Sequence, residues 1–581
     1  MTTPLLTRPP LVPISRRELT HALLIALALF AAFFALAAGT DLWDRDEPRY
    51  ARAAVEMWNT GDYLIPWLND QPRLRKPPMI YWMMAPFVGL LGPTALAARL
   101  VCVICMTAAA LLTWLAGRRL FSPNIGLGSM AIFGTATLTL YVGSASIIDA
   151  PLVMFTNLAI YCFIDAIYRK PTWWHWPTIA LCLASVVLLK GPLVWPIPVV
   201  TIAVAGFLAR KQITLPRSWW IGFASLALLS FVPLIAWAIP VDRATDGQLY
   251  AIGFQKHVVD RITTGLEGHG SSNALEYFLL LPLYIPILLL IFFPWTLHLP
   301  AALSAMIGRR LGNPLERAIL WAWTLPWFIL ASLASTKLPH YILPILPALA
   351  IAVAATIARH HAGQLSDSDR RWMTRGIFLA LPVALGGAIA AIALPWALDS
   401  TGLILNELPV VIALLAITFL ATYHHLKGRV LQSARLIAAA TPPIVIAMVL
   451  LVLPTIENQL KASPTIAAAI HQQQTDPTAP LYMRDYDEPT LFFYVNRPTG
   501  HPIVQLNGQQ VANWARGEAD FTRQSPNEAG LLIIGSEELD RIQQRFGELP
   551  LQTTFTKSII DYSSGTQYTQ VMLVKPTTPN P

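Results

Sequence analysis

Charged residues are scarce in this chain. Asp, Glu, Lys and Arg make up 13% of its 581 residues, whereas 55% are hydrophobic. A soluble protein carries about twice that charged fraction. Segments of about twenty apolar residues recur along most of the chain, which predicts a mainly α, polytopic helical membrane protein. The net charge of +8 does not require nucleic acid, because the basic residues lie scattered in loops between apolar segments.

Cysteine is also scarce, and all four residues fall inside predicted membrane spans: Cys102, Cys105, Cys162 and Cys182. The first two have the spacing of a redox motif, but a buried cysteine that acts as a small hydrophobe is favoured there. We therefore assign no disulfide and no metal site. The sequence lacks an internal repeat, a heptad run and a glycine-rich phosphate loop. Secondary transporters are often built from repeated halves, so the lack of a repeat argues against that class.

Thirteen apolar runs predict about thirteen transmembrane helices. The runs are 20–40, 95–117, 124–143, 147–167, 174–190, 192–209, 218–239, 277–304, 318–334, 338–357, 374–396, 404–422 and 434–454. The first exceeds the length of about 7–15 residues typical of a cleaved signal, which favours a retained anchor.

A shorter apolar run, 77–91, contains Pro86 in its interior. If this run does not cross the membrane, the Arg and Lys clusters between the spans all fall on one side, as the positive-inside rule requires of a cytoplasmic face. If it crosses, every later loop inverts and the rule fails. We therefore predict that 77–91 is re-entrant or interfacial and that 41–93 is the first outer loop, with two membrane-lying helices.

The predicted topology divides the chain into a transmembrane domain, 1–454, and a C-terminal domain, 455–581. Strand-like runs at 480–483, 491–495, 530–534 and 570–574, with a helical pattern at 536–547, predict a small α/β domain outside the membrane. The predicted location is a cell inner membrane, with the outer loops and the C-terminal domain in the periplasm.

The most informative polar stretch is Asp44-Arg45-Asp46-Glu47-Pro48-Arg49-Tyr50, after the first apolar run. Asp46 or Glu47 can cap a helix, Pro48 suits its first turn and Gly61 can end it. Its pattern is that of a short amphipathic helix on a membrane surface. Ionisable groups beside hydrocarbon are costly and usually mark a working site.

Acids and bases are interleaved on the predicted outer face. They are Asp44, Asp46, Glu47, Arg49, Lys76, Asp149, Lys190, His257, Arg261, His269, Lys337 and His340. This mixture suits the transfer of a group from an anionic carrier to a hydroxyl. A carboxylate takes the acceptor's proton, while cations hold the phosphate leaving group.

Several motifs in this order resemble those of the polyprenyl-phosphate-sugar-dependent GT-C glycosyltransferases, in particular the lipid A aminoarabinose transferase family, which is related to the protein mannosyltransferases. The resemblance covers about residues 15–455. The motifs are Asp46-Glu47-Pro48-Arg49-Tyr50-Ala51, Gly61-Asp62-Tyr63, Lys76-Pro77-Pro78 with Tyr81-Trp82, Asp149-Ala150-Pro151, Lys190-Gly191-Pro192 and Lys337-Leu338-Pro339-His340-Tyr341.

The resemblance implies an inverting transferase that moves a sugar from undecaprenyl-type phosphate to a hydroxyl of a lipid A-like glycolipid or another envelope acceptor. It assigns Asp46 as the catalytic carboxylate and gives Asp149 a catalytic role. The implied donor-phosphate or substrate-binding residues are Glu47, Arg49, Tyr50, Lys76, His257, Arg261, Lys337 and Tyr341. No cofactor is predicted, although Asp44, Asp46, Glu47 and Asp149 could gather around a divalent cation.

Two positions depart from the family pattern. The aminoarabinose transferases commonly carry Glu where Arg75 and Lys256 stand here. Both changes replace an acid by a base, and an amino sugar is cationic. We therefore hypothesise a neutral or acidic sugar in place of aminoarabinose.

Each candidate residue also has a purely structural interpretation. Asp46 and Asp149 could cap helices, Lys190 could extend from the end of a span towards the interface, and Lys337 and Tyr341 could be interface anchors. His257 and Arg261 are one helical turn apart, which also fits an exposed face. The alternative functions are a lipid-phosphate transporter or flippase, and a glycosyltransferase that acts on protein or polysaccharide. The sequence leaves the sugar, the acceptor and the oligomeric state open.

Overall fold

The computed structural model describes residues 13–43, 46–169, 171–213, 215–253, 274–397, 402–486, 488–518, 530–561 and 567–577. The chain forms two compact units. The first comprises Met1–Ala37, Leu74–Ile80 and Leu100–Met448, and the second comprises Ala38–Arg73, Tyr81–Arg99 and Val449–Pro581. The predicted first outer loop therefore groups largely with the C-terminal segment, although the chain division at residue 454 stays a prediction.

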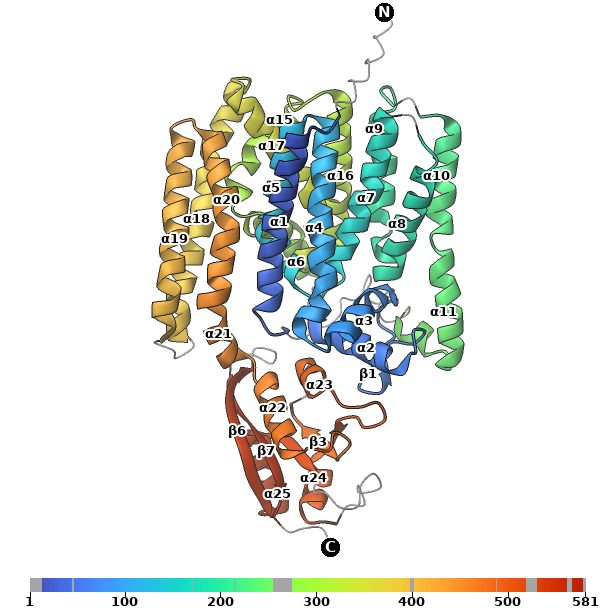
Figure 1. The fold of residues 1–581 in the computed structure, drawn as a ribbon, viewed down its shortest axis with the longest axis vertical. Coiled ribbons are helices and arrows are strands. Elements are labelled where there is room, and N and C mark those ends of the chain that lie inside the picture. Colours follow the sequence, from blue (N-terminus) through green and yellow to red (C-terminus); the bar gives the residue numbers. More distant parts are fainter. Residues whose placement is uncertain are drawn as a thin grey trace, which may run out of the picture. The chain divides into compact units, whose positions relative to one another are not determined.

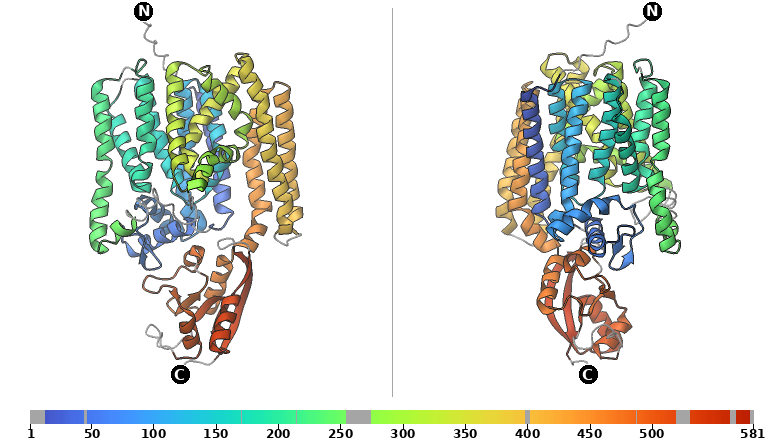
Figure 2. Two further views of the ribbon diagram at one scale, coloured as in Figure 1. Left: turned by 180° about the vertical axis from the view of Figure 1, so that it is seen from behind. Right: turned by 45° about the vertical axis from the view of Figure 1, so that its right-hand side comes forward.

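The first unit is a bundle of apolar helices that run side by side (Figures 1 and 2). Helix α7 packs on α8, α5 on α17, α9 on α16 and α18 on α19. Its elements are α1 (Arg16–Ala38), α5 (Pro123–Gly134), α6 (Thr137–Ser144), α7 (Asp149–Tyr168), α8 (His175–Lys190), η1 (Pro192–Val194), α9 (Pro196–Leu208), α10 (Arg217–Leu229), α11 (Val232–Ala244), α13 (Ala274–Leu280), η3 (Leu281–Leu283), α14 (Tyr284–Ile291), η4 (Trp295–Leu297), α15 (Leu299–Ile307), α16 (Pro314–Leu333), η5 (Pro339–Ile345), α17 (Leu346–His361), α18 (Asp367–Ala397) and α19 (Gly402–Leu426), with most of α4 (Ala95–Leu120) and α20 (Val430–Leu451).

Among the described residues, eight helices are long and apolar enough to cross a membrane, or nine if one bent pair counts as a single span. The chain is therefore a multi-pass membrane protein, and the count of about thirteen spans stays a prediction. Each of the thirteen predicted runs is helical over most of its length. The run 124–143 is not one straight helix, because α5 and α6 meet at an angle of 67°. The break falls after Gly134, at Thr135 and Ala136, where two residues leave the helix.

The second unit begins with the part of the chain that was predicted to form the first outer loop. It contains α2 (Asp46–Thr60), β1 (Trp67–Leu68), β2 (Gln71–Pro72) and most of α3 (Met79–Leu91). Helix α2 ends at Gly61, whose φ of +71° and N–H bond to Met57 O close the last turn. The thirteen residues of α3 extend for about 20 Å, less than the roughly 30 Å of a hydrocarbon core.

The C-terminal segment of the second unit is a small α/β domain, as predicted. Its described five-stranded sheet has the order β4-β3-β5-β7-β6, with β3 parallel to β4 and β5, and β7 antiparallel to both neighbours. The strands are β3 (Leu481–Arg484), β4 (Val504–Gln505), β5 (Leu531–Gly535), β6 (Leu551–Asp561) and β7 (Gln567–Pro576), and the helices are α21 (Leu453–Leu460), α22 (Ser463–Gln473), α23 (Pro489–Val495), α24 (Gly508–Ala515) and α25 (Ser536–Phe546).

Helices cover both faces of this sheet. Side chains alternate between the two faces along a strand, so neighbouring residues of β5 belong to different cores. Leu531 and Ile533 pack in the core with α22 and α23, whereas Leu532 and Ile534 pack in the core with α24 and α25. β5 is therefore apolar throughout, as expected for a strand buried on both sides.

The strand predicted at 491–495 is wrong, because this segment is the helix α23. Its apolar run resembles a buried strand in composition. Pro489 occupies the first turn of the helix, and Asn496 ends it in the left-handed conformation with a φ of +48°. These flanking signals, which are typical of a short helix, decide the structure.

Candidate functional site

Three elements of the first unit bring charged side chains together around Asp149. This residue opens α7, and its carboxylate is 5% exposed. Lys190, the last residue of α8, donates from Nζ to Asp149 Oδ1 over 2.8 Å. His340 Nε2, from η5, lies 3.9 Å from the other carboxylate oxygen. Lys190 Nζ also lies 5.1 Å from the ring centroid of Tyr341.

The local fold explains why Lys190 reaches this cluster. Gly191 ends α8 with a φ of +79°, and its N–H donates to Val187 O. A cation at the carboxyl end of a helix is favoured by the helix dipole. Lys190 is the last residue of α8, and its ammonium group reaches Asp149 from the end of that helix.

The charge of Lys76 also attracts the Asp149 carboxylate, less strongly than those of Lys190 and His340. Lys76 and Lys190 together carry two positive charges against the single negative charge of Asp149. Such an arrangement suits an anionic group, and lysine binds phosphate as a point charge.

Lys337, the lysine of the late Lys-Leu-Pro motif, lies at the carboxyl end of α16. Its ammonium group donates to the carbonyl oxygens of Ser332 and Ala334, at the carboxyl end of α16. It also faces the rings of Tyr277 and Tyr284, at 5.8 and 5.9 Å. Burial lowers the pKa of Lys337. These contacts favour a structural role, in which Lys337 stabilises the end of a helix.

A second group of polar side chains lies at the start of α2, in the second unit. Asp46 is the first residue of the helix and is exposed. Arg73, which is buried, donates from Nε to the Tyr81 hydroxyl over 3.1 Å and lies 5.3 Å from the Tyr50 ring centroid. Burial opposes the charge of Arg73, but Tyr81, Tyr50 and Asp46 together raise its pKa. Asp46 is thus an accessible carboxylate near a buried, permanently charged guanidinium.

Glu47 is placed differently from its neighbour Asp46. It is 3% exposed, and Arg99 donates to both of its oxygens over 2.8 and 2.7 Å. Trp43 N–H donates to the same carboxylate over 2.8 Å. These bonds fix the chain on either side of residues 44–45. Glu47 therefore helps to position this segment, and its substrate-binding role stays a prediction.

The C-terminal domain holds the residues just before α2. Tyr494 donates its hydroxyl proton to Asp41 Oδ1 over 2.9 Å and accepts the Leu42 N–H over 2.9 Å. Asp41 N–H donates to both oxygens of Glu457 over 3.1 Å, and Lys461 donates to Asp41 O. Burial lowers the pKa of Lys461 and raises that of Tyr494. The segment that leads into Asp46 is thus anchored on several buried polar groups.

The polar face of α2 is buried as well, whereas an amphipathic surface helix was expected. Arg52, 4% exposed, donates to Glu56 over 2.7 Å, to Asn496 Oδ1 over 2.6 Å and to Arg497 O over 2.7 Å. Glu56 also accepts the Asn69 N–H over 2.9 Å. The charged face of α2 therefore binds the C-terminal domain, through partners more than 400 residues away in sequence.

The remaining predicted residues are placed as follows. Arg49 is half-buried, and Tyr50 is buried with its ring 6.0 Å from that of Tyr81. His257 and Arg261 lie outside the described residues.

Within the described ranges, no group of three or more His, Cys, Asp or Glu side chains is placed to hold a metal ion. Arg73 and Arg99 belong to none of the family motifs, although Arg73 stands in the same charged run as Lys76.

A family model described as dolichyl-phosphate-mannose-protein mannosyltransferase matches residues 75–237. The undecaprenyl phosphate-alpha-4-amino-4-deoxy-L-arabinose arabinosyl transferase of Pectobacterium carotovorum is 29% identical over 340 residues, which is 58% of each chain. The transferase of the same name from Pseudomonas paraeruginosa is 27% identical over 386 residues, 65% of this chain and 66% of that protein. The match thus spans less than two thirds of the length of these relatives.

Solved structures show the same fold over nearly the whole chain. The crystal structure of ArnT from Cupriavidus metallidurans bound to undecaprenyl phosphate has a TM-score of 0.73 at 17% identity, and covers 95% of this chain and 97% of that one. The apo structure of the same protein gives a TM-score of 0.70 at 17% identity, with 96% and 98% covered. These comparisons confirm the resemblance that the motifs predicted, including the GT-C fold.

Proposed function

We propose that this chain is a glycosyltransferase that moves a sugar from a polyprenyl phosphate to a hydroxyl of a lipid A-like glycolipid. The observation that carries the proposal is the buried Asp149 carboxylate, to which Lys190 donates a hydrogen bond and on which the charge of Lys76 acts. It occurs in a fold shared with a protein whose structure holds undecaprenyl phosphate. The named activity of the sequence relatives is of the same class.

In this reaction the acceptor oxygen bonds to the anomeric carbon while the bond from that carbon to the carrier phosphate breaks. Direct displacement inverts the configuration at that carbon. Asp46, which the motif resemblance assigns as the catalytic carboxylate, takes the acceptor's proton. The electron pair leaves with the phosphate, whose negative charge increases. Lys76 and Lys190 offset that charge.

The hydrocarbon tail of the carrier needs an apolar surface inside the membrane. The first unit contains a cavity of about 200 Å³ whose lining residues come mainly from α6, α18, α19 and α20. Leu140, Ile377, Leu414 and Met448 are among its apolar walls. We propose that such intramembrane surface receives part of an isoprenoid chain. The positive-inside rule supports an inner-membrane protein with its active site and C-terminal domain in the periplasm.

Replacing Lys190 by Met is expected to raise KM for the polyprenyl-phosphate sugar by about tenfold to a hundredfold, because a charge-assisted phosphate contact is lost. The single variant also leaves the buried Asp149 without its nearest cation. The double variant Asp149→Asn with Lys190→Met removes both charges and should recover folded yield without recovering donor affinity. Full donor affinity in the double variant would contradict a phosphate-binding role.

The identity of the sugar is tested by competition between amino-sugar and neutral-sugar polyprenyl phosphates. The relatives are named for an amino sugar, whereas Arg75 and Lys256 favour a neutral or acidic sugar by charge. Arg75 is exposed, and Lys256 lies outside the described residues. We expect transfer from the neutral donor, measured as the mass gained by the acceptor. Exclusive use of the amino sugar would overturn the charge argument.

A protein acceptor is the second candidate, because the matching family model is described as a protein mannosyltransferase. The purified protein is incubated with one donor and either lipid A or a serine- and threonine-containing peptide. A sugar mass added to lipid A supports the proposal, and one added only to the peptide supports the second candidate.

A further inference from the structure

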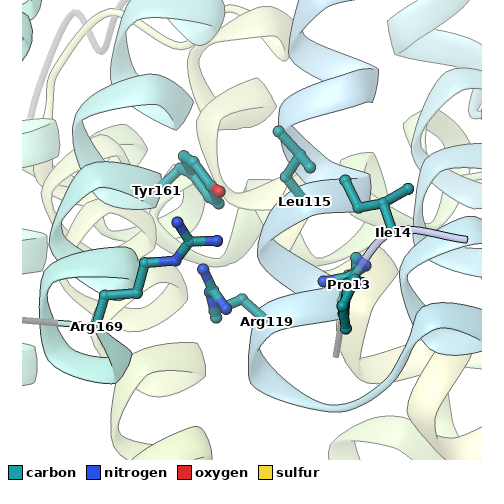
Figure 3. A pocket seen from close by; sticks show the side chains of 7 residues that line it. Pro13, Ile14, Leu115, Arg119, Tyr161 and Arg169 are labelled. Atoms are coloured by element: carbon teal, nitrogen blue, oxygen red, sulfur yellow. The ribbon is translucent and has the colours of Figure 1, made fainter. Parts of the chain in front are cut away.

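The first unit contains a cavity of about 280 Å³ that plays no part in the proposed reaction. It is lined by Pro13, Ile14, Leu115, Arg118, Arg119, Tyr161 and Arg169. Figure 3 shows the guanidinium groups of Arg119 and Arg169 directed into the same space, near the hydroxyl of Tyr161. Three arginines therefore converge on one cavity, from the carboxyl ends of α4 and α7.

The cavity lies at the opposite end of α7 from Asp149. Asp149 is the first of the twenty residues of α7, and Arg169 follows the last. A helix of twenty residues is about 30 Å long, roughly the thickness of the hydrocarbon core. The arginine cavity and the Asp149 cluster thus belong to opposite membrane faces, so the cavity is distinct from the proposed donor-phosphate site.

Acidic partners neutralise part of the arginine charge. Arg118 Nε lies 2.7 Å from Glu18 Oε1, and Arg119 pairs closely with Asp165. Arg169 shares Asp165 over a longer distance, 3.4 Å, and its side chain is 53% exposed. Among the described residues, three guanidinium groups thus face two carboxylates, and the summed charge of these five side chains is positive.

Arg169 is the arginine best placed to bind a further anion. A strong charge-assisted N–H···O bond is about 2.7–2.9 Å long, so its 3.4 Å contact with Asp165 is weak. A guanidinium carries five N–H donors. Arg169 therefore has donor capacity beyond Asp165, and its exposure makes those donors accessible.

We propose that this cavity binds the phosphate group of an anionic glycerophospholipid from the surrounding bilayer. Arginine forks match phosphate oxygens in two parallel hydrogen bonds, and the Tyr161 hydroxyl supplies another donor. Ile14, 45% exposed, and Leu115 provide apolar surface beside the charged groups. Basic pockets at the ends of transmembrane helices are suited to lipid headgroups.

The test is native mass spectrometry of the full-length protein titrated with phosphatidylglycerol or phosphatidylcholine. Wild-type protein should bind phosphatidylglycerol in preference to phosphatidylcholine. Arg169→Gln should weaken phosphatidylglycerol binding by about tenfold to a hundredfold, because it removes a charge-assisted contact. Arg371→Gln, at an exposed arginine that does not line the cavity, should bind as the wild type does.

A second variant and a competitor make the outcome decisive. Tyr161→Phe keeps the aromatic ring and should weaken binding by a smaller factor, about threefold to tenfold. Equal phosphatidylglycerol binding by wild type, Arg169→Gln and Tyr161→Phe would overturn the proposal. Displacement of the lipid by inorganic phosphate at similar concentration would show a site for free phosphate and would overturn the lipid assignment.

Discussion

Replacing Asp46 by Asn is expected to reduce sugar transfer by about a hundredfold to ten thousandfold, the range for loss of a general base. Asparagine keeps the size of the side chain and its ability to cap α2, but it does not take a proton. Asp46 is exposed at the first residue of the helix, so the substitution leaves buried contacts intact. The measurement is kcat with saturating donor and acceptor.

The matched control is Asp70→Asn in the same loop. Asp70 Oδ2 accepts the Gly500 N–H over 2.9 Å, and the amide oxygen of asparagine can accept the same bond. Asp70→Asn should keep wild-type kcat and wild-type folding. An Asp46→Asn variant that transfers sugar at the wild-type rate would show that Asp46 only caps the helix.

Replacing Arg99 by Met is expected to destabilise the protein by about 3–5 kcal/mol, because the buried carboxylate of Glu47 loses the cation that donates to both of its oxygens. Arg99 is 1% exposed and forms two bonds to Glu47, as well as bonds to the carbonyl oxygens of Thr40 and Asp41. The measured quantity is the unfolding temperature in detergent. It is read as the temperature at which the monodisperse peak in size-exclusion chromatography is lost.

Two comparisons separate the buried ion pair from a general effect of losing arginine. Arg371→Met, at an exposed position, should leave the unfolding temperature unchanged. Adding Glu47→Gln to Arg99→Met removes the uncompensated charge and should restore part of the lost stability. An unfolding temperature in Arg99→Met equal to that of the wild type would contradict the anchoring role of this pair.

The helices of the first unit could be predicted from sequence because each apolar run is long and local. Their breaks could not all be predicted in this way. The bend of 67° between α5 and α6 follows from two residues after Gly134, which change the hydropathy of the run very little. In the C-terminal domain, 491–495 has the composition of a strand, and only the flanking Pro489 and Asn496 indicate a helix.

Motifs in the sequence point to Asp149 and Lys190, although no contact between the two was predicted. The contacts that support the candidate site could not be predicted, because they join residues far apart in sequence. Arg99 and Glu47 are 52 residues apart, and Arg52 and Asn496 are 444 apart. Such pairs leave no periodic signal. The sequence therefore predicted that the charged face of α2 lies on the surface, whereas Arg52 and Glu56 on that face are buried against the C-terminal domain.

The central claim is that the sugar leaves its carrier in a reaction that this chain catalyses. The most direct test reconstitutes the purified protein in liposomes with a polyprenyl-phosphate sugar, labelled in the sugar, and lipid A as acceptor. The account predicts that the label moves to lipid A while free polyprenyl phosphate appears in equal amount. A donor that crosses the bilayer with its sugar still attached, and no labelled lipid A, would contradict the account and indicate a flippase.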